Sequence, residues 1–338
     1  SDGLTWEKPA LGLYPKVNGG KNNILPYFLK SDGIGVYLDP SQPRGSPERF
    51  KAVGTKHEAA GEGTGGVFTS HDGFTWGGAR SIEWPEPHRY DCHNNMFYSE
   101  RRQQYVVTTR DANFLNCSCR KGEIAWNASY CQREIGLGFS EAGKGFVFDA
   151  SRPTPRSLSG TLSHQLYSQI TFPWLDVWLG LVMVYEETNP HNLVRCRLAW
   201  TRDIFAAGTP AGEWAWVDEG GLTGKEFIPL NSTGERAKTQ PTGQAFDSHL
   251  IYASRPVHLP DHERLYYVGN NGPHSGCAGQ EQTAPHCRNA SLGLATLRKD
   301  GFAGVSGTGT LTTRPLTVGG KGVLTLSVDV LSGGSVRV

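Results

Sequence analysis

The sequence predicts an all-β protein, a five-bladed β-propeller with the start of a C-terminal β-sandwich-like segment. Two observations carry this prediction. The motif Asp-Gly-x-Thr-Trp occurs twice, beginning at Asp2 and at Asp72, 70 residues apart. The rest of the chain has almost no helical periodicity and reads as short apolar runs separated by Gly, Pro, Asn and Asp. A long repeat built from strands and turns is typical of propeller blades.

The repeated motif predicts a tight turn at a blade corner. Gly tolerates positive φ and Asp hydrogen-bonds its own backbone, so the pair closes a turn before the Trp begins a buried strand. We interpret both copies, of the Asp-box type, as structural. A degraded third copy, Trp200-Thr-Arg-Asp-Ile-Phe205, lies 131 residues after the second, close to two further periods.

Eleven segments have the apolar or alternating pattern of strands. They are Gly33–Leu38, Arg49–Val53, Gly66–Ser70, Asn95–Tyr98, Gln104–Thr109, Tyr167–Thr171, Trp178–Tyr185, Val194–Thr201, His249–Ala253, Arg264–Gly269 and Ser291–Arg298.

Four segments place a polar residue just before an apolar strand that is followed by a turn and a second strand. They begin at Asp32, Asp91, His164 and Asp247. In a propeller the first strand of each blade lines the central channel, so these residues are expected to converge at one mouth. Asp32 stands between Ser31 and Gly33, where a plain turn is the simpler interpretation.

Composition excludes several classes of partner. The chain has 338 residues and a formal net charge of +1, so it lacks the basic surplus of a nucleic-acid-binding protein. No apolar run is long enough to span a bilayer. The 43 Gly and 20 Pro follow no period, which argues against a collagen-like chain.

Cysteines and glycosylation sequons predict a secreted or cell-surface glycoprotein. Four sequons begin at Asn116, Asn127, Asn231 and Asn289, each in a stretch that reads as loop. Cys277 and Cys287 are expected to close one loop, and Cys131 to pair with either Cys117 or Cys119. Zinc binding by the Cys117-x-Cys119 cluster is the less favoured alternative, because its spacing is not that of a structural zinc site. Cys196, in an apolar strand, is expected to be buried.

The chain divides near residue 305. Residues 1–304 are assigned to the propeller, whose first blade is expected to be incomplete at the N-terminus. Residues 305–338 are assigned to the start of a β-sandwich-like appendage or to closing strands.

Several segments resemble the five-bladed propeller proteins of the glycoside hydrolase family 32-like group. They are Asp2-Gly-Leu-Thr-Trp-Glu-Lys-Pro, Val36-Tyr-Leu-Asp-Pro, Phe172-Pro-Trp-Leu-Asp-Val-Trp, Phe246-Asp-Ser-His-Leu-Ile-Tyr-Ala and Ala290-Ser-Leu-Gly-Leu-Ala-Thr-Leu-Arg-Lys-Asp-Gly-Phe. The resemblance spans nearly the whole chain and implies a carbohydrate-active propeller. The sequence departs from family 32 invertases in two motifs: the nucleophile motif of the Trp-Met-Asn-Asp-Pro type and the Glu-Cys acid motif are both absent.

Asp91 and Asp247 are the candidate catalytic residues. Hydrolysis of a glycosidic bond uses two carboxyl groups, one donating a proton and one attacking or activating water. A propeller mouth can supply them from different blades. The alternative for each is an Asp that caps the start of a strand.

Seven other residues are candidates for contacting a sugar. Strand periodicity places His93 on the face of Asp91, and His249 on the face of Asp247. Arginine can hold hydroxyl or acidic groups, and aromatic faces stack on pyranose rings. The predicted set is His93, His164, Tyr167, His249, Arg89, Arg110 and Trp174. A divalent metal held by the imidazoles and carboxylates is the less favoured alternative, and no cofactor is expected.

Two functions remain open from the sequence. The favoured one is a secreted glycoside hydrolase acting on a poly- or oligosaccharide. The alternative is a non-catalytic extracellular glycoprotein that binds carbohydrate, or serves a structural role, with a degenerate active site.

Overall fold

A computed structural model describes most of the chain. The described residues are 2–28, 31–57, 63–77, 80–81, 93–112, 133–146, 156–161, 163–186, 192–206, 209–231, 245–274, 290–313 and 326–337. The chain divides into two compact units, Ser1–Gly301 and Phe302–Val338. The first unit is built from β-strands, as the sequence predicts, and its described residues also include short 3-10 turns at Asn18–Gly20, Pro26–Phe28, Ile204–Ala206 and Gly221–Thr223.

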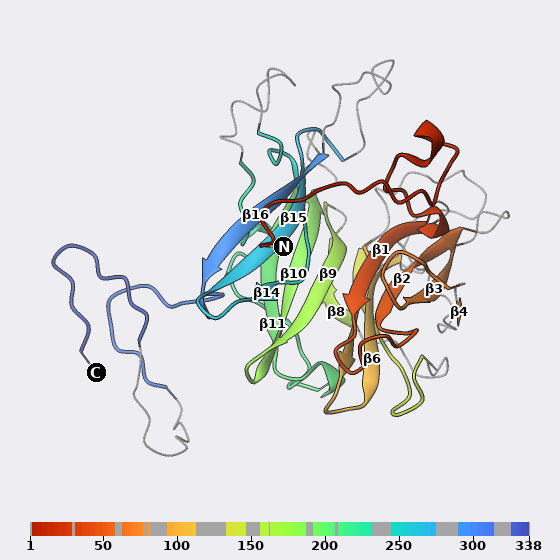
Figure 1. Cartoon of the computed structure of the whole chain (residues 1–338). Coiled ribbons are helices and arrows are strands. Elements are labelled where there is room, and N and C mark those ends of the chain that lie inside the picture. The colour runs from red at the N-terminus through yellow and green to blue at the C-terminus, as the bar shows by residue number, and fades with distance from the viewer. Residues whose placement is uncertain are drawn as a thin grey trace, which may run out of the picture. The chain divides into compact units, whose positions relative to one another are not determined.

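Blades one and two are four-stranded antiparallel sheets whose strands follow the order of the sequence (Figure 1). Blade one consists of β1 (Ser31–Leu38), β2 (Phe50–His57), β3 (Gly63–Ser70) and β4 (Arg80–Ser81). Blade two consists of β5 (Asn95–Ser99), β6 (Gln104–Ala112), β7 (Arg133–Phe139) and β8 (Arg156–Ser159).

Blades three and four are joined into one sheet by a single parallel pair, Val194 with Leu250. Blade three consists of β9 (His164–Trp174), β10 (Val177–Glu186), β11 (Val194–Thr201) and β12 (Ala215–Trp216). Blade four consists of β13 (Leu250–Ala253), β14 (Val257–His258), β15 (His262–Asn270) and β16 (Ala290–Arg298). The five-blade count stays a prediction, because the described residues form four blades.

Apolar side chains pack between successive blades. Val53 and Val67 of blade one meet Met96 and Val107 of blade two. Ile135 of blade two meets Leu166, Val182 and Ala199 of blade three. The first strands also contact one another directly. Asn94, next to β5, donates its backbone N–H to Gly33 O of β1 at 2.9 Å, and the Asn95 amide donates to Thr171 O of β9 at 3.4 Å. The inner strands therefore converge.

The two Asp-Gly-x-Thr-Trp copies form the same turn, which confirms their structural interpretation. Asp72 Oδ1 accepts the N–H groups of Phe74 and Thr75 at 2.8 and 2.7 Å. Asp2 Oδ1 accepts those of Leu4 and Thr5 at 2.8 and 3.1 Å. In each copy the Trp indole donates to the carbonyl of the motif's Gly. The third copy keeps only part of this pattern, with Asp203 Oδ1 accepting from Phe205 N at 2.9 Å.

The N-terminal copy of the motif lies on blade four rather than on blade one. Tyr266 of β15 donates its hydroxyl to Gly3 O at 2.7 Å. Arg264 donates to Asp2 O, and the Trp6 ring meets the Tyr266 ring edge to face at 5.7 Å. A segment 263 residues away along the chain thus covers the second strand of blade four.

All eleven predicted strands are present, and five others were not predicted. Four of these are edge strands of two to four residues, β4, β8, β12 and β14. The fifth, β7, contains Gly136 and Gly138, which weaken the strand pattern in the sequence.

The second unit, Phe302–Val338, contains no strand among its described residues 302–313 and 326–337. The start of a β-sandwich therefore stays a prediction for this part of the chain. In the described residues, no helix is long and apolar enough to cross a membrane.

Candidate functional site

Six side chains gather at one end of blades two, three and four, and we call them the ring cluster. They are His93, Arg110, Tyr167, Tyr185, Tyr252 and His274. His93 and Tyr167 lie near the beginnings of first strands, and Tyr252 lies in the four-residue first strand β13. Arg110, Tyr185 and His274 lie near or beyond the ends of second strands. First and second strands of a blade run antiparallel, so these positions share one end of the blades. This is the end where the inner strands begin.

Tyr167 is at the centre of the ring cluster. Its ring centroid lies 5.1 Å from that of His93, 5.7 Å from that of Tyr252 and 4.8 Å from that of His274. The Tyr185 ring meets it edge to face at 6.2 Å. The rings come from the first strands of two blades and from segments beside them, so the arrangement depends on the whole fold.

His93 occupies its position because β1 and the segment before β5 approach very closely. The backbone and side-chain N–H groups of Asn94 both donate to Gly33 O, at 2.9 and 3.1 Å. A Cβ on Gly35 would lie 1.9 Å from Asn94 O, so only glycine permits this approach. His93 itself has φ of 58°, uncommon for a residue with a side chain, and its ring stacks on Tyr252 at 4.5 Å and 6°. Backbone strain of this kind is concentrated at functional positions.

Arg110 supplies a positive charge beneath the rings. Its guanidinium carbon lies 4.1 Å from the Tyr167 ring centroid, within the range of a cation–π contact. Arg110, Tyr167 and Tyr185 are buried, whereas the rings of His93, Tyr252 and His274 are half-buried. The cluster thus combines three buried side chains with three partly accessible rings.

The phenol of Tyr167 is fixed by His274, whose Nε2 lies 2.8 Å from the Tyr167 hydroxyl. The His274 ring also packs on Tyr185, with centroids 4.6 Å apart. A phenol and an imidazole in contact can pass a proton between them and to a bound molecule. Flat apolar faces, imidazole nitrogens and a guanidinium together suit a ligand with both C–H faces and hydroxyl groups.

Asp247, a candidate catalytic residue, is buried beside blade four. Its Oδ2 accepts the Tyr267 hydroxyl at 2.7 Å, and Oδ1 has no hydrogen-bond partner among the described residues. Burial together with this carboxylate raises the pKa of Tyr267, so the phenol stays protonated and donating. The Asp247 Cβ is also close to Gly269 of β15, where a Cβ would lie 2.6 Å away. Among the described residues, the side chain of Asp247 therefore contacts blade four.

His249 lies between Asp247 and Tyr252 and is buried. Its Nδ1 is 2.9 Å from the Ser248 hydroxyl, and its backbone N–H donates to Asn270 O at 3.0 Å. His164 is half-buried at the start of β9, with Nδ1 3.0 Å from Ser163 Oγ. His164 is the first residue of β9, as predicted, whereas His249 directly precedes β13, which begins at Leu250.

Trp174 lies far from the ring cluster. It follows Tyr167 by seven residues of one strand, about 23 Å at about 3.3 Å per residue. Its ring contacts His258 at 4.8 Å, and Lys299 Nζ lies 5.6 Å from its centroid. Trp174 and Tyr167 therefore belong to opposite ends of β9 and do not stack on the same sugar ring.

Several predicted residues lie outside the described part of the chain. They are Asp91, Arg89, Asn116, Asn127, Asn289, Cys117, Cys119, Cys131, Cys277 and Cys287. The described Asn231 has an exposed side chain, and its backbone N–H donates to Asp247 O at 3.2 Å. Cys196 is a free, buried thiol, as predicted, and burial raises its pKa to about 12. Within the described ranges, no three His, Cys, Asp or Glu side chains come together as a metal site.

The sequence identifies His93, Arg110 and Tyr167, but it does not single out Tyr185, Tyr252 or His274. One signal for Tyr252 was present. His164-Gln-Leu-Tyr167 and His249-Leu-Ile-Tyr252 share the pattern His-x-apolar-Tyr at the start of an inner strand. Tyr185 and His274 reach the site from a second strand and from the segment after one, and no local pattern marks such positions.

Comparison with known proteins gives a likeness of fold. No protein-family model and no curated protein matches the sequence. An N-acetylgalactosamine deacetylase from F. plautii, solved with blood group B trisaccharide, is 13% identical with a TM-score of 0.52, covering 89% of this chain and 80% of that one. The Bombyx mori GH32 β-fructofuranosidase BmSUC1 is 10% identical with a TM-score of 0.48, covering 80% of this chain and 48% of that one.

A GH93 α-L-arabinofuranosidase of Fusarium graminearum, in complex with arabinobiose, is also 10% identical, with a TM-score of 0.46. That alignment covers 81% of this chain and 64% of the arabinofuranosidase. This chain spans about half the length of the fructofuranosidase. The predicted resemblance to propellers of the family 32 type is confirmed as a resemblance of fold.

Proposed function

We propose that this protein binds a carbohydrate at the ring cluster and hydrolyses a glycosidic bond there. The observation that carries the proposal is the cluster itself: four aromatic or imidazole rings around Tyr167, with Arg110 beneath it, at the end where the inner strands begin. Pockets for sugars combine ring faces with a few fixed polar groups.

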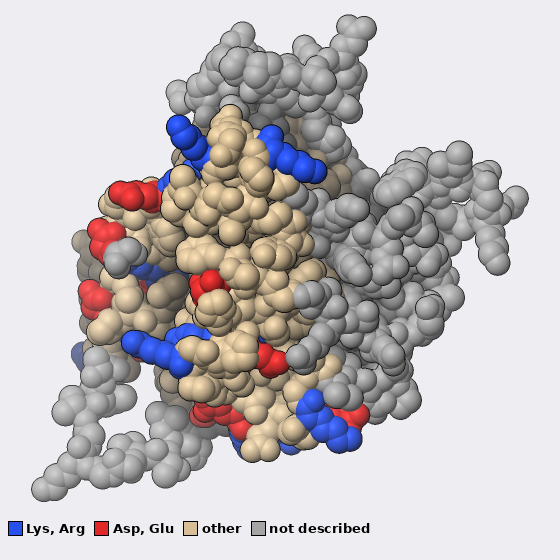
Figure 2. All heavy atoms as spheres, turned by 45° about the vertical axis from the view of Figure 1, so that its right-hand side comes forward, with Lys and Arg blue, Asp and Glu red and all other residues tan. Residues whose placement is uncertain are grey.

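The fold is consistent with this substrate class. The F. plautii deacetylase, which shares the fold, was solved with a trisaccharide bound. Because one fold supports many activities, this likeness bears on the kind of ligand and not on the reaction. The charge distribution is consistent with an uncharged ligand such as a carbohydrate, since basic and acidic side chains are interspersed among the described residues on the face drawn in Figure 2.

In the proposed reaction Asp91 and Asp247 share the acid and the nucleophile or base roles. Asp91 precedes His93 by two residues, and Asp247 precedes Tyr252 by five. Each therefore belongs to a segment that leads directly into the ring cluster. Arg110, His93 and Tyr252 would hold the sugar, and His274 would orient the Tyr167 phenol.

Carbohydrate binding without hydrolysis is the second candidate function. It is favoured by the position of Asp247, whose carboxylate is buried and engaged by Tyr267. A carboxylate held in this way stabilises blade four without reaching a substrate. The missing Glu-Cys acid motif points in the same direction.

The two candidates differ in one experiment. The wild-type protein is incubated with a panel of oligosaccharides, and released sugars are measured by chromatography. We expect cleavage of at least one member, with a loss of more than 100-fold in Asp91→Asn and in Tyr167→Ala, since acid–base groups contribute about 10²- to 10⁴-fold. Binding of a panel member without any cleavage would favour the second candidate.

The matched control is Trp174→Ala. It removes an aromatic side chain from the same strand as Tyr167 but from the opposite end, so cleavage should be unchanged. Loss of cleavage in this control would contradict the assignment of the site to the ring cluster. The predicted secretion, glycosylation and disulfides are part of the proposal and are tested by the mass of the protein purified from a eukaryotic secretion host.

A further inference from the structure

An open pocket of about 390 Å³ lies on blade three, beside strand β11. Its lining includes Glu186, Arg195, Arg197, Lys225 and Glu226. None of these residues belongs to the ring cluster.

The pocket lies where the pairing along one edge of β11 is interrupted, between two of its partners. Ala199 and Trp200 pair with β12, and Cys196 forms an isolated bridge with Ile228. Val217 and Phe227 donate their backbone N–H groups to Leu198 O and Cys196 O, at 3.0 and 2.8 Å, and residues 218–226 form a loop between these two bonds. Asp218 Oδ1 closes this loop by accepting the N–H groups of Gly220 and Lys225, at 2.9 and 3.1 Å. The pocket therefore has a fixed rim.

Arg197 projects from β11 at this open stretch. Its side chain is only 3% exposed, and its Nε and Nη1 have no hydrogen-bond partner among the described residues. Burial, together with the charge of Arg195, lowers the pKa of Arg197, although the carboxylates of Glu226, Glu186 and Asp218 act in the opposite direction. A buried guanidinium without a partner is costly, and a ligand that accepts its N–H groups would remove that cost.

The two carboxylates in the pocket are already engaged by the other arginine. Arg195 Nε lies 2.5 Å from Glu186 Oε1, and Arg195 Nη1 also contacts Glu226 Oε1. Glu226 Oε2 accepts the Leu230 N–H at 2.6 Å as well. Three cationic side chains and two carboxylates line the pocket, which leaves an excess of one positive charge.

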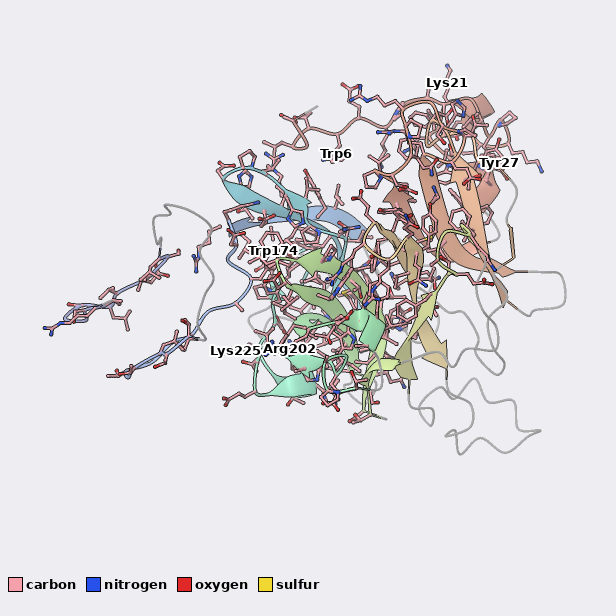
Figure 3. The ribbon with its side chains drawn as sticks, turned by 90° about the horizontal axis from the view of Figure 1, so that it is seen from below. Trp6, Lys21, Tyr27, Trp174, Arg202 and Lys225 are labelled. Carbon is pink, nitrogen blue, oxygen red and sulfur yellow. The ribbon has the colours of Figure 1, made fainter. Side chains whose placement is uncertain are left out.

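From this arrangement we infer that the pocket binds a small molecule carrying one singly charged oxyanion group, a carboxylate or a sulfate ester. The guanidinium of Arg197 matches the planar pair of oxygens that such groups present. Lys225, which projects from blade three in Figure 3, adds a second cation at the rim. The volume lies in the lower part of the range for small-molecule pockets and suits a ligand of monosaccharide size. A doubly charged phosphate is disfavoured by Glu186 and Glu226.

The test is a calorimetric titration of the full chain with sodium glucuronate, with glucose 6-sulfate and with glucose. We expect saturable binding of glucuronate, of glucose 6-sulfate or of both, and none of glucose. Binding of one charged sugar alone identifies which oxyanion the pocket takes. Binding of neither, or equal binding of glucose, would overturn the inference.

Arg197→Met is the decisive variant. It keeps the length and apolar stem of the side chain and removes the unpartnered charge, so the protein should fold with an unchanged or higher melting temperature. Affinity for the charged sugar should fall at least tenfold, since charge-assisted hydrogen bonds are the strong ones. Unchanged affinity in a folded Arg197→Met protein would refute the site.

Arg202→Met is the matched control. Arg202 is exposed and lies just after β11, with its guanidinium 5.7 Å from the Trp200 ring, and it is not among the residues that line the pocket. Its replacement should leave affinity within twofold of wild type. This site and the ring cluster share no residue. If the pocket binds no charged sugar, the proposed hydrolysis at the ring cluster is unaffected, and a failure of the proposed hydrolysis would not affect the inference about the pocket.

Discussion

Asp39 and Lys51 form a fully buried ion pair on blade one, with Lys51 Nζ 2.7 Å from Asp39 Oδ2. The same carboxylate oxygen accepts the Tyr105 hydroxyl of blade two at 2.7 Å. Burial alone would raise the pKa of Asp39, but the hydrogen bonds from Lys51, Ser41 and Tyr105 hold it below its ordinary value. The ion pair therefore joins two blades, and the ionised state of Asp39 depends on the hydrogen bonds from all three partners.

Removing one partner of this pair should be strongly destabilising. Lys51→Met leaves the Asp39 carboxylate buried without its counterion, a change that costs about 3–5 kcal/mol in proteins. The free energy of unfolding, measured in urea, should fall by that amount. Lys21→Met, at an exposed lysine labelled in Figure 3, is the control and should change stability by less than about 0.5 kcal/mol. A small effect of Lys51→Met would mean that the pair is open to water.

The Asp-box turn is an element whose stability depends on an ionised carboxylate. The hydrogen bond from the Thr75 N–H, together with that from the Phe74 N–H, lowers the pKa of Asp72 to about 2, although partial burial acts to raise it. The pKa of Asp72 in the folded state thus lies below the ordinary 3.8. The ionised carboxylate therefore contributes fully to the stability of the fold above pH 3.8, and this contribution is lost as the pH falls through about 2.

Asp72→Asn should reveal this dependence. The amide oxygen keeps the turn's shape but loses the charge, so the variant is less stable than wild type above about pH 5. The difference in unfolding free energy should shrink between about pH 4 and pH 2. Asp2→Asn, in the N-terminal copy, should behave in the same way, because the backbone N–H groups of Leu4 and Thr5 also lower the pKa of Asp2. A difference that is constant with pH would contradict the assigned bonds.

The N-terminal copy of the motif also closes the molecule's last described blade. Trp6→Ala removes the edge-to-face contact with Tyr266 and should cost about 1 kcal/mol, the worth of such an aromatic pair. A lower melting temperature in a thermal scan would show it. Leu175→Ala, at a side chain 86% exposed, serves as the control. Equal melting temperatures for Trp6→Ala and wild type would mean that the N-terminal segment does not hold blade four.

For the molecule as a whole, local sequence patterns predict most strands of the blades, but they do not predict which residues come together at the ring cluster. Strands such as β10 and β11 have strong apolar signals, and the Asp-Gly-x-Thr-Trp turns are specified by their own residues. Gly136 and Gly138 concealed β7. The ring cluster unites segments from three blades, so the partners of Tyr167 follow from topology and from the close approach at Gly35. Sequence periodicity likewise does not predict the parallel pairing between β11 and β13.

The most direct test of the account is a glycan-array binding measurement on the wild-type protein and on Tyr252→Ala, a ring-cluster variant outside the predicted carboxylate pair. We expect the wild-type protein to bind a defined subset of glycans, Tyr252→Ala to lose that binding and Trp174→Ala to keep it. If wild type binds no glycan, or if a folded Tyr252→Ala protein binds the same subset equally well, the ring cluster is not a carbohydrate site.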